Sequence, residues 1–209
     1  PRLNGNEKKY VNECLDSTWL SGMGKFVDKF QDSFAQFIGS KHAAAVCNGT
    51  VALHLALEAL GIGEGDEVIV PTLTYVASVN AITYTGAKPV FVDSLEDTWQ
   101  LDPEDVVKKI TPATKAILCV HLYGHSCDMK SLKKITEKFN LFLIEDCAEA
   151  IGSEYEGKHV GNFGDVATFS FYGNKTITTG EGGMVTTNDR TLHDRIVHLK
   201  GKGLAKYRE

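Results

Sequence analysis

The chain has 209 residues, of which 43% are hydrophobic and 23% are charged, and its formal net charge is −5 at pH 7. This composition is ordinary for a globular protein with a sizeable core, and the length suits one large domain or two small ones. Because no run of about 18 apolar residues and no basic cluster with interleaved aromatics occurs, we expect neither a membrane nor a nucleic acid as a partner.

Helical and strand-like segments alternate along the chain. A first helix is predicted over 25–39, where four phenylalanines recur at helical spacing, as is typical of packing: Phe26, Phe30, Phe34 and Phe37. Six short apolar runs follow, at 43–47, 66–71, 88–93, 115–124, 141–148 and 166–173. They are continuous rather than alternating, which predicts parallel strands buried on both faces.

Segments with helical spacing lie between these runs, at 49–61, 76–82, 102–111 and 128–140. Asp102 and Asp128 are candidate N-caps, and Pro103 stands at a first helical position. The alternation predicts an α/β domain whose mostly parallel sheet is flanked by helices.

The five cysteines are odd in number and form no CxxC motif, which argues against a disulfide framework or a zinc site. The first ten residues lack the apolar region of a signal peptide. We therefore expect a reducing, cytoplasmic location.

Ligands of open α/β sheets bind beyond the carboxyl ends of the strands, so polar residues there are candidate site residues. Gly49 and Thr50 follow the first run and open a helix, whose unpaired amides and dipole favour an anion such as phosphate. A plain helix start is an equally good explanation of this turn.

Four further residues at strand ends offer chemistry. Asp146 ends a buried run, where an unpaired carboxylate is costly, and Ser170 brings a hydroxyl into an apolar strand. Tyr75 stands at a strand-to-helix junction and can stack on a flat ring. Lys175 lies between a buried strand and the glycine-rich turn 180–183, although a solvated lysine is the ordinary alternative.

These groups together describe a site for pyridoxal phosphate. The phosphate would bind the 49–50 turn and Ser170, the ring would lie against Tyr75, and the ring nitrogen would meet Asp146. The aldehyde would form a Schiff base with Lys175.

Long ordered blocks of the chain carry a resemblance: "NGTVALHLALEALGIGEGDEVIVPTLTYVAS", "GAKPVFVD", "VHLYGHSCDM", "IEDCAEAIGS" and "FSFYGNKTITTGEGGMVTTND". With them the chain resembles the DegT/DnrJ/StrS family of pyridoxal-phosphate sugar aminotransferases, most closely its perosamine-synthase-like branch. The resemblance implies a fold-type I aminotransferase and a homodimer with active sites at the subunit interface. It also implies transfer of an amino group, usually from glutamate, to a keto-sugar nucleotide of the 4-keto-6-deoxy type.

Family members are nearly twice as long as this chain. The resemblance therefore implies that residues 1–209 comprise an N-terminal segment and the large cofactor-binding domain, and that a small C-terminal domain is missing. The block 17–27 is similar to a segment near the rim of the family's active site.

Carried over by position, Lys175 matches the Schiff-base lysine and Asp146 the aspartate at the pyridine nitrogen. Thr50 and Ser170 match phosphate ligands, and Tyr75 matches a stacking aromatic. A further match is Glu149, which stands where many relatives have Gln or His near the cofactor hydroxyl. As a carboxylate it would need a shared proton to contact that oxygen.

Other interpretations remain open. Related proteins that dehydrate sugars replace the lysine with histidine, which Lys175 argues against, and a catalytically silent pyridoxal-phosphate protein is a second alternative. A Rossmann-type nucleotide binder is disfavoured because no GxGxxG follows the first strand. His121 and His125 are four residues apart, but they lie on a predicted strand end and turn rather than on a helix, so we expect no metal site.

Overall fold

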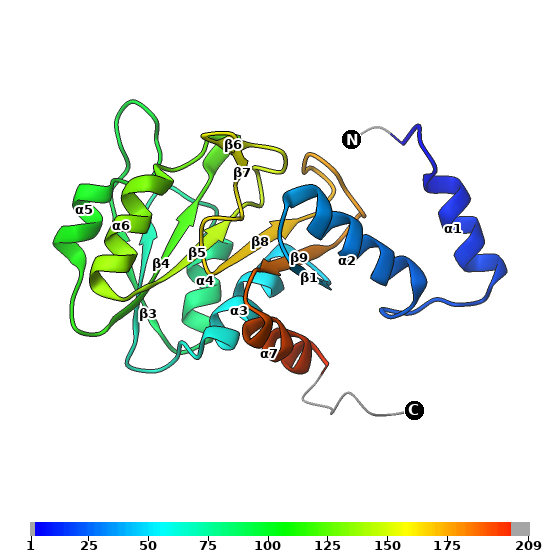
Figure 1. Ribbon diagram of the computed structural model, residues 1–209, viewed down its shortest axis with the longest axis horizontal. Coiled ribbons are helices and arrows are strands. Elements are labelled where there is room, and N and C mark those ends of the chain that lie inside the picture. The colour runs from blue at the N-terminus through cyan, green and yellow to red at the C-terminus, as the bar shows by residue number, and fades with distance from the viewer. Residues whose placement is uncertain (1–2, 202–209) are drawn as a thin grey trace.

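The computed structural model describes residues 3–201, so residues 1–2 and 202–209 of the predicted domain lie outside the described part (Figure 1). A seven-stranded sheet forms its centre. In chain order the strands are β1 (His42–Val46), β2 (Glu67–Pro71), β3 (Lys88–Val92), β4 (Thr114–Val120), β5 (Phe142–Asp146), β8 (Val166–Ser170) and β9 (Gly183–Thr187). Their spatial order is β1-β9-β8-β5-β4-β2-β3.

The sheet is mostly parallel, as predicted. All pairs from β8 to β3 are parallel, whereas β9 runs antiparallel to both β1 and β8. The six predicted runs are all strands, but β9 was not predicted. Because β9 lies between β1 and β8, the two strands before the candidate phosphate turn and the candidate lysine are joined through it.

Helices cover both faces of the sheet (Figure 1). They are α1 (Glu7–Asp16), α2 (Lys25–Ile38), α3 (Gly49–Leu60), α4 (Val76–Tyr84), α5 (Pro103–Lys109), α6 (Met129–Phe139) and α7 (Arg190–Lys200). A 3-10 turn, η1 (Leu122–Gly124), and a small hairpin of β6 (Glu154–Tyr155) and β7 (Lys158–His159) complete the described elements.

Alternate residues of the strands enter different core layers. Val68 and Val70 pack into a cluster with residues of α3, α4 and α7, whereas Ile69 between them packs with α5 and α6. Helix α2 covers the sheet at β8 and β9, where Phe169 and Met184 are buried against it. Burial on both faces explains why the strands read as continuous apolar runs.

Side-chain caps fix several helix starts. Asp102 accepts a hydrogen bond from the amide of Glu104 at 2.8 Å, and Asp128 accepts one from Ser131 at 3.1 Å, as the sequence predicted. The phenylalanine stripe of α2 is core only in part, because Phe34 is buried while Phe37 is 51% exposed. Among residues 3–201, no helix combines the length and apolar character needed to cross a bilayer.

Candidate active site

A cavity of about 420 Å³ lies at the carboxyl ends of β1, β2, β4, β5 and β8. Every residue that the sequence singled out for the cofactor lines it: Gly49, Thr50, Tyr75, Asp146, Glu149, Ser170 and Lys175. The structure thus brings together residues spread over more than 120 positions of the chain, although their individual roles stay predictions. None of residues 17–27 lines this cavity.

The start of α3 forms one end of the cavity. Asn48 caps this helix by accepting the amide hydrogen of Val51 at 2.9 Å, and its carbonyl accepts from Ala52. Within the described residues, the amides of Gly49 and Thr50 have no acceptor. A helix start with two free amides is suited to bind a phosphate.

Ser170 lies against this turn, at the end of β8. A Cβ atom on Gly49 would stand 2.9 Å from Cβ of Ser170, so a glycine is needed for the two to approach. Gly183 has a similar role, since a Cβ there would stand 2.3 Å from the carbonyl oxygen of Asn48. Gly183 therefore lets β9 pass close to the 48–50 turn.

Asp146 ends β5 and is 5% exposed. Its Oδ1 accepts the amide hydrogen of Ala148 at 3.1 Å, and its Oδ2 accepts the hydroxyl of Ser78 at 2.8 Å. Burial raises the pKa of Asp146, and these two donors, together with the charges of His121 and Lys175, act in the opposite direction. Such a carboxylate gains from a cation brought into the cavity.

Lys175 follows β8 on a turn in which its amide donates to the carbonyl of Tyr172 at 2.9 Å. Its Nζ lies 3.4 Å from Oε1 of Glu149, and its side chain is 19% exposed. The other oxygen of Glu149 accepts the amide of Tyr123 at 2.9 Å. Tyr123 has a φ of 55°, a left-handed conformation that costs a residue with a Cβ about 1–2 kcal/mol. The carboxylate of Glu149 thus contacts both the lysine amine and the backbone amide of this turn.

Tyr75 is the N-cap residue of α4, and its side chain is 72% exposed at the cavity mouth. The sequence did not point to Ser78, which lies one turn further along α4 and is buried beneath the cavity. A serine in an otherwise apolar helix start is the only signal that could have drawn attention to it.

Glu145 lies next to Asp146 but on the opposite face of the sheet. Its side chain is fully buried and accepts hydrogen bonds from His121 at 3.1 Å, from the amides of Gly161 and Phe163 at 2.7 Å each, and from Gly164 at 2.6 Å. Burial alone would raise the pKa of Glu145, but the histidine and the backbone donors hold it below its usual value.

Ligand-type atoms of His121, Glu145 and Cys147 lie within 4.8 Å of one another. Nδ1 of His121 accepts the amide hydrogen of Cys127 at 3.1 Å, and the other ring nitrogen faces Glu145. His125 is exposed and does not join the group. His121 and Glu145 form a hydrogen-bonded clamp that ties the end of β4 and β5 to the loop 161–164.

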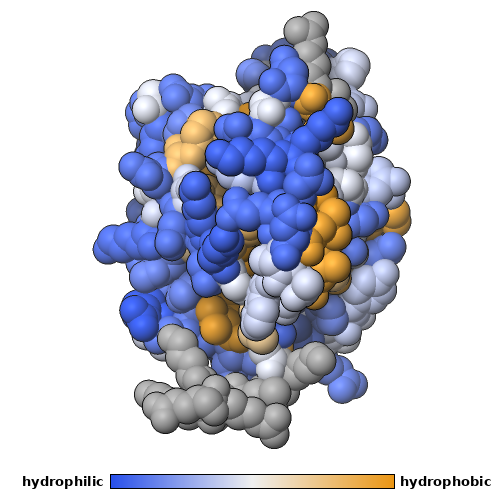
Figure 2. Space-filling model, turned by 90° about the vertical axis from the view of Figure 1, so that its right-hand side faces the viewer, coloured by the Kyte–Doolittle hydropathy of each residue, from blue (hydrophilic) through white to orange (hydrophobic). Residues whose placement is uncertain are grey.

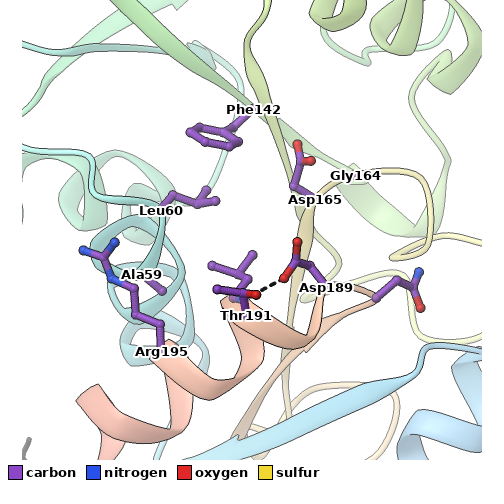
Figure 3. Close-up of a pocket in the computed structure, with 10 residues that line it drawn as sticks. Ala59, Leu60, Phe142, Gly164, Asp165, Asp189, Thr191 and Arg195 are labelled. Carbon is purple, nitrogen blue, oxygen red and sulfur yellow. Dashed lines mark hydrogen bonds between the residues drawn. The ribbon is translucent and has the colours of Figure 1, made fainter.

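A second cavity, of about 540 Å³, lies at the opposite end of the sheet (Figure 3). Phe142 at the start of β5, Asp165 before β8 and Arg195 of α7 border it. Asp165 already accepts from the amide of Leu143, and Asp189 caps α7 by accepting from Leu192. Although it is larger than the first cavity, it contains none of the predicted site residues.

A family model of the DegT/DnrJ/EryC1/StrS aminotransferase family matches residues 1–209. The chain belongs to this family. It is 65% identical over 209 residues to the GDP-perosamine synthase of Escherichia coli O157:H7, covering 100% of this chain and 57% of the relative. The chain spans about half the length of the curated relatives described here.

Solved structures are similar along nearly the whole chain. An aminotransferase from Psychrobacter cryohalolentis superimposes with a TM-score of 0.95 at 42% identity, covering 99% of this chain and 53% of that one. A putative sugar aminotransferase from Streptococcus pneumoniae, solved in a PLP form, superimposes with a TM-score of 0.89 at 31% identity, covering 95% and 56%. The architecture is that of the fold-type I aminotransferases, as the sequence resemblance implied.

Proposed function

We propose that the whole protein is a pyridoxal-phosphate-dependent aminotransferase that moves an amino group from glutamate to a keto-sugar nucleotide. The observation that carries this proposal is one cavity bordered by a lysine amine, a buried carboxylate and a helix start with free amides. Membership of the aminotransferase family and the similarity to a GDP-perosamine synthase support it.

The residues present fit this cofactor. The cavity volume of about 420 Å³ falls within the usual range of small-molecule sites, about 300–1,000 Å³. Gly49 has no Cβ to collide with Ser170, so the 49–50 turn and Ser170 lie side by side. The free amides of this turn suit a phosphate. Asp146 suits a protonated ring nitrogen because its burial makes an unpaired charge costly.

When bound, pyridoxal phosphate supplies an aldehyde that accepts the amino group and a ring that delocalises negative charge. Lys175 would hold the aldehyde and then, as a free amine, move a proton at the substrate's α-carbon. Asp146 would keep the ring nitrogen protonated, because each charge favours the other. Glu149 would orient the Lys175 amine, which it contacts at 3.4 Å.

The substrate class rests on the relatives. We propose a nucleotide-linked 4-keto-6-deoxy sugar as acceptor, because the chain is 65% identical to a GDP-perosamine synthase and similar to other sugar transaminases. The product would be an amino sugar for polysaccharide synthesis.

We further propose a cytoplasmic homodimer with shared active sites. Helix α1 has no buried residue and stands apart from the sheet (Figure 1). It and the segment after it expose large apolar side chains, and the space-filling view from this end has apolar patches between hydrophilic ones (Figure 2). The exposed apolar side chains of α1 and the segment after it include Val11, Leu15, Trp19, Leu20 and Met23. Such a surface is suited to a subunit contact, and five free cysteines suit a reducing compartment.

The decisive test of the activity is an assay of the whole protein with glutamate and a set of nucleotide keto-sugars. We expect release of 2-oxoglutarate with at least one sugar, and its loss in Lys175→Ala. Lys130→Ala, on the surface of α6, is the matched control and should keep the activity. Undiminished release in Lys175→Ala would contradict the proposed mechanism.

A further inference from the structure

Ser78 is a buried hydroxyl that none of the proposed catalytic steps uses. It lies in the first turn of α4 and is 1% exposed. Its Oγ is 2.8 Å from Oδ2 of Asp146, a residue 68 positions away in the chain. A serine hidden at this depth needs a partner for its hydroxyl, and the carboxylate of Asp146 is that partner.

The directions of the hydrogen bonds follow from the chemistry of the groups. An ionised carboxylate only accepts, so the single hydroxyl hydrogen of Ser78 goes to Asp146. The Oγ of Ser78 is then the acceptor of its other contact, with Oγ1 of Thr74 at 3.0 Å, which is shorter than the 3.4 Å from the same Oγ1 to the carbonyl oxygen of Tyr75. Thr74 also lines the cavity. The result is a chain of donors from Thr74 through Ser78 to Asp146, in which each bond strengthens the next.

We propose that Ser78 is a positioning residue for the reaction, which holds the carboxylate of Asp146 in one orientation in the cavity, where it would meet the ring nitrogen of the cofactor. This inference rests on the proposed function, because it assigns Ser78 a part in the same site. Thr74 supports Ser78 by donating a hydrogen bond to its hydroxyl oxygen.

The geometry of Asp146 carries the inference. Its two oxygens are each held by a donor from a different element, Oδ1 by the amide of Ala148 and Oδ2 by Ser78 on α4. Two separate donors stop the carboxyl group from rotating about its terminal bond, which is otherwise a soft torsion. The remaining lone pairs stay available to a donor in the cavity.

The charge state of Asp146 also depends on these donors. Burial favours the neutral acid, and a neutral acid could not hold a proton on the ring nitrogen. The hydroxyl of Ser78 and the amide of Ala148 act against burial. Without Ser78, the carboxylate would keep the amide of Ala148 as its one hydrogen-bond donor among residues 3–201.

The test uses the whole protein, freed of cofactor and then titrated with pyridoxal phosphate. Ser78→Ala should weaken cofactor binding about ten-fold, as expected for the loss of one hydrogen bond to a charged group. Thr74→Val should weaken it about three-fold, since it removes a neutral bond. Ser78→Cys, with a weak donor of similar size, should fall between wild type and Ser78→Ala.

Two further readouts separate positioning from simple loss of stability. The visible absorbance of the lysine-bound cofactor should shift in Ser78→Ala, and kcat should fall while the KM for glutamate stays unchanged. Thr83→Ala is the control on the same helix, because its exposed hydroxyl donates only to the carbonyl of Asn80. It should leave binding, spectrum and kcat unchanged.

Asp146→Asn, measured beside these variants, makes the outcomes distinguishable. If Asp146→Asn weakens binding and shifts the spectrum while Ser78→Ala and Ser78→Cys do neither, the inference about Ser78 is wrong and the proposed function stands. If neither Asp146→Asn nor Ser78→Ala changes them, the proposed role of Asp146 fails as well. A lower unfolding midpoint of Ser78→Ala with an unchanged spectrum would also overturn the positioning role.

Discussion

Replacing Glu145 by glutamine tests whether the clamp beneath the site holds β4, β5 and the loop 161–164 together. Oε1 of Glu145 accepts from Phe163 and Gly164, and Oε2 accepts from Gly161 and His121. A glutamine keeps one oxygen and turns the other into an amide nitrogen that can only donate. In either orientation, that nitrogen faces two donors that have lost their acceptor, the buried pair Gly161 and His121 or the partly buried amides of Phe163 and Gly164.

The expected magnitude follows from the two orphaned donors. Each buried unsatisfied donor costs about 1–3 kcal/mol, and breaking a buried pair costs about 3–5 kcal/mol, so we expect a loss of about 3–5 kcal/mol. Urea unfolding of the whole protein, followed by circular dichroism, measures the difference. The control is Glu154→Gln in the β6–β7 hairpin, whose carboxylate is 52% exposed and should contribute less than about 1 kcal/mol.

The pH dependence adds a second check. Because the pKa of Glu145 is held below its usual value, its contribution to stability is complete above the ordinary glutamate pKa. It is lost as the pH falls through the lowered pKa of the folded state. The gap between wild type and Glu145→Gln should therefore be widest near pH 7 and shrink in acid. A loss below about 1 kcal/mol at pH 7 would refute the clamp.

Two further predictions concern the cavity itself. Gly183→Ala should destabilise the protein by about 1–3 kcal/mol and weaken cofactor retention, because its Cβ would overlap the carbonyl of Asn48 and displace the 48–50 turn, which we propose to bind the phosphate. Gly22→Ala, which meets nothing within 4 Å, is the control in thermal unfolding, and equal effects of the two would contradict this account. Because burial raises the pKa of Asp146, the charged carboxylate costs stability near pH 7, so the unfolding midpoint of cofactor-free Asp146→Asn should improve relative to wild type as the pH rises from acid to 7. A difference in midpoint that stays constant or falls over this range would count against the prediction.

The strands were predictable because their residues are buried on both faces, which leaves continuous apolar runs in the sequence. Strand β9 was not, since it begins with a glycine and ends in two threonines, Thr186 and Thr187. It is a strand because β1 and β8 supply partners on both sides. Such tertiary pairing overrides a weak local preference.

The candidate site was predictable where each residue stands at a strand end or on the turn just after it, as Asp146, Ser170 and Lys175 do. Residues that act from inside a helix or from the far face of a strand were not. Ser78 reads as an ordinary small residue until α4 brings it to 2.8 Å from Asp146. Glu145 stands beside Asp146 in sequence, yet only the alternation of β5 reveals that the two carboxylates face opposite layers.

The most direct test of the central claim is to treat the whole protein with pyridoxal phosphate, reduce it with borohydride and locate the modified lysine by peptide mass spectrometry. The account predicts that the cofactor is fixed on Lys175, in the peptide that joins β8 to β9, and that the visible absorbance disappears on reduction. Modification of a different lysine, or of none, would contradict it.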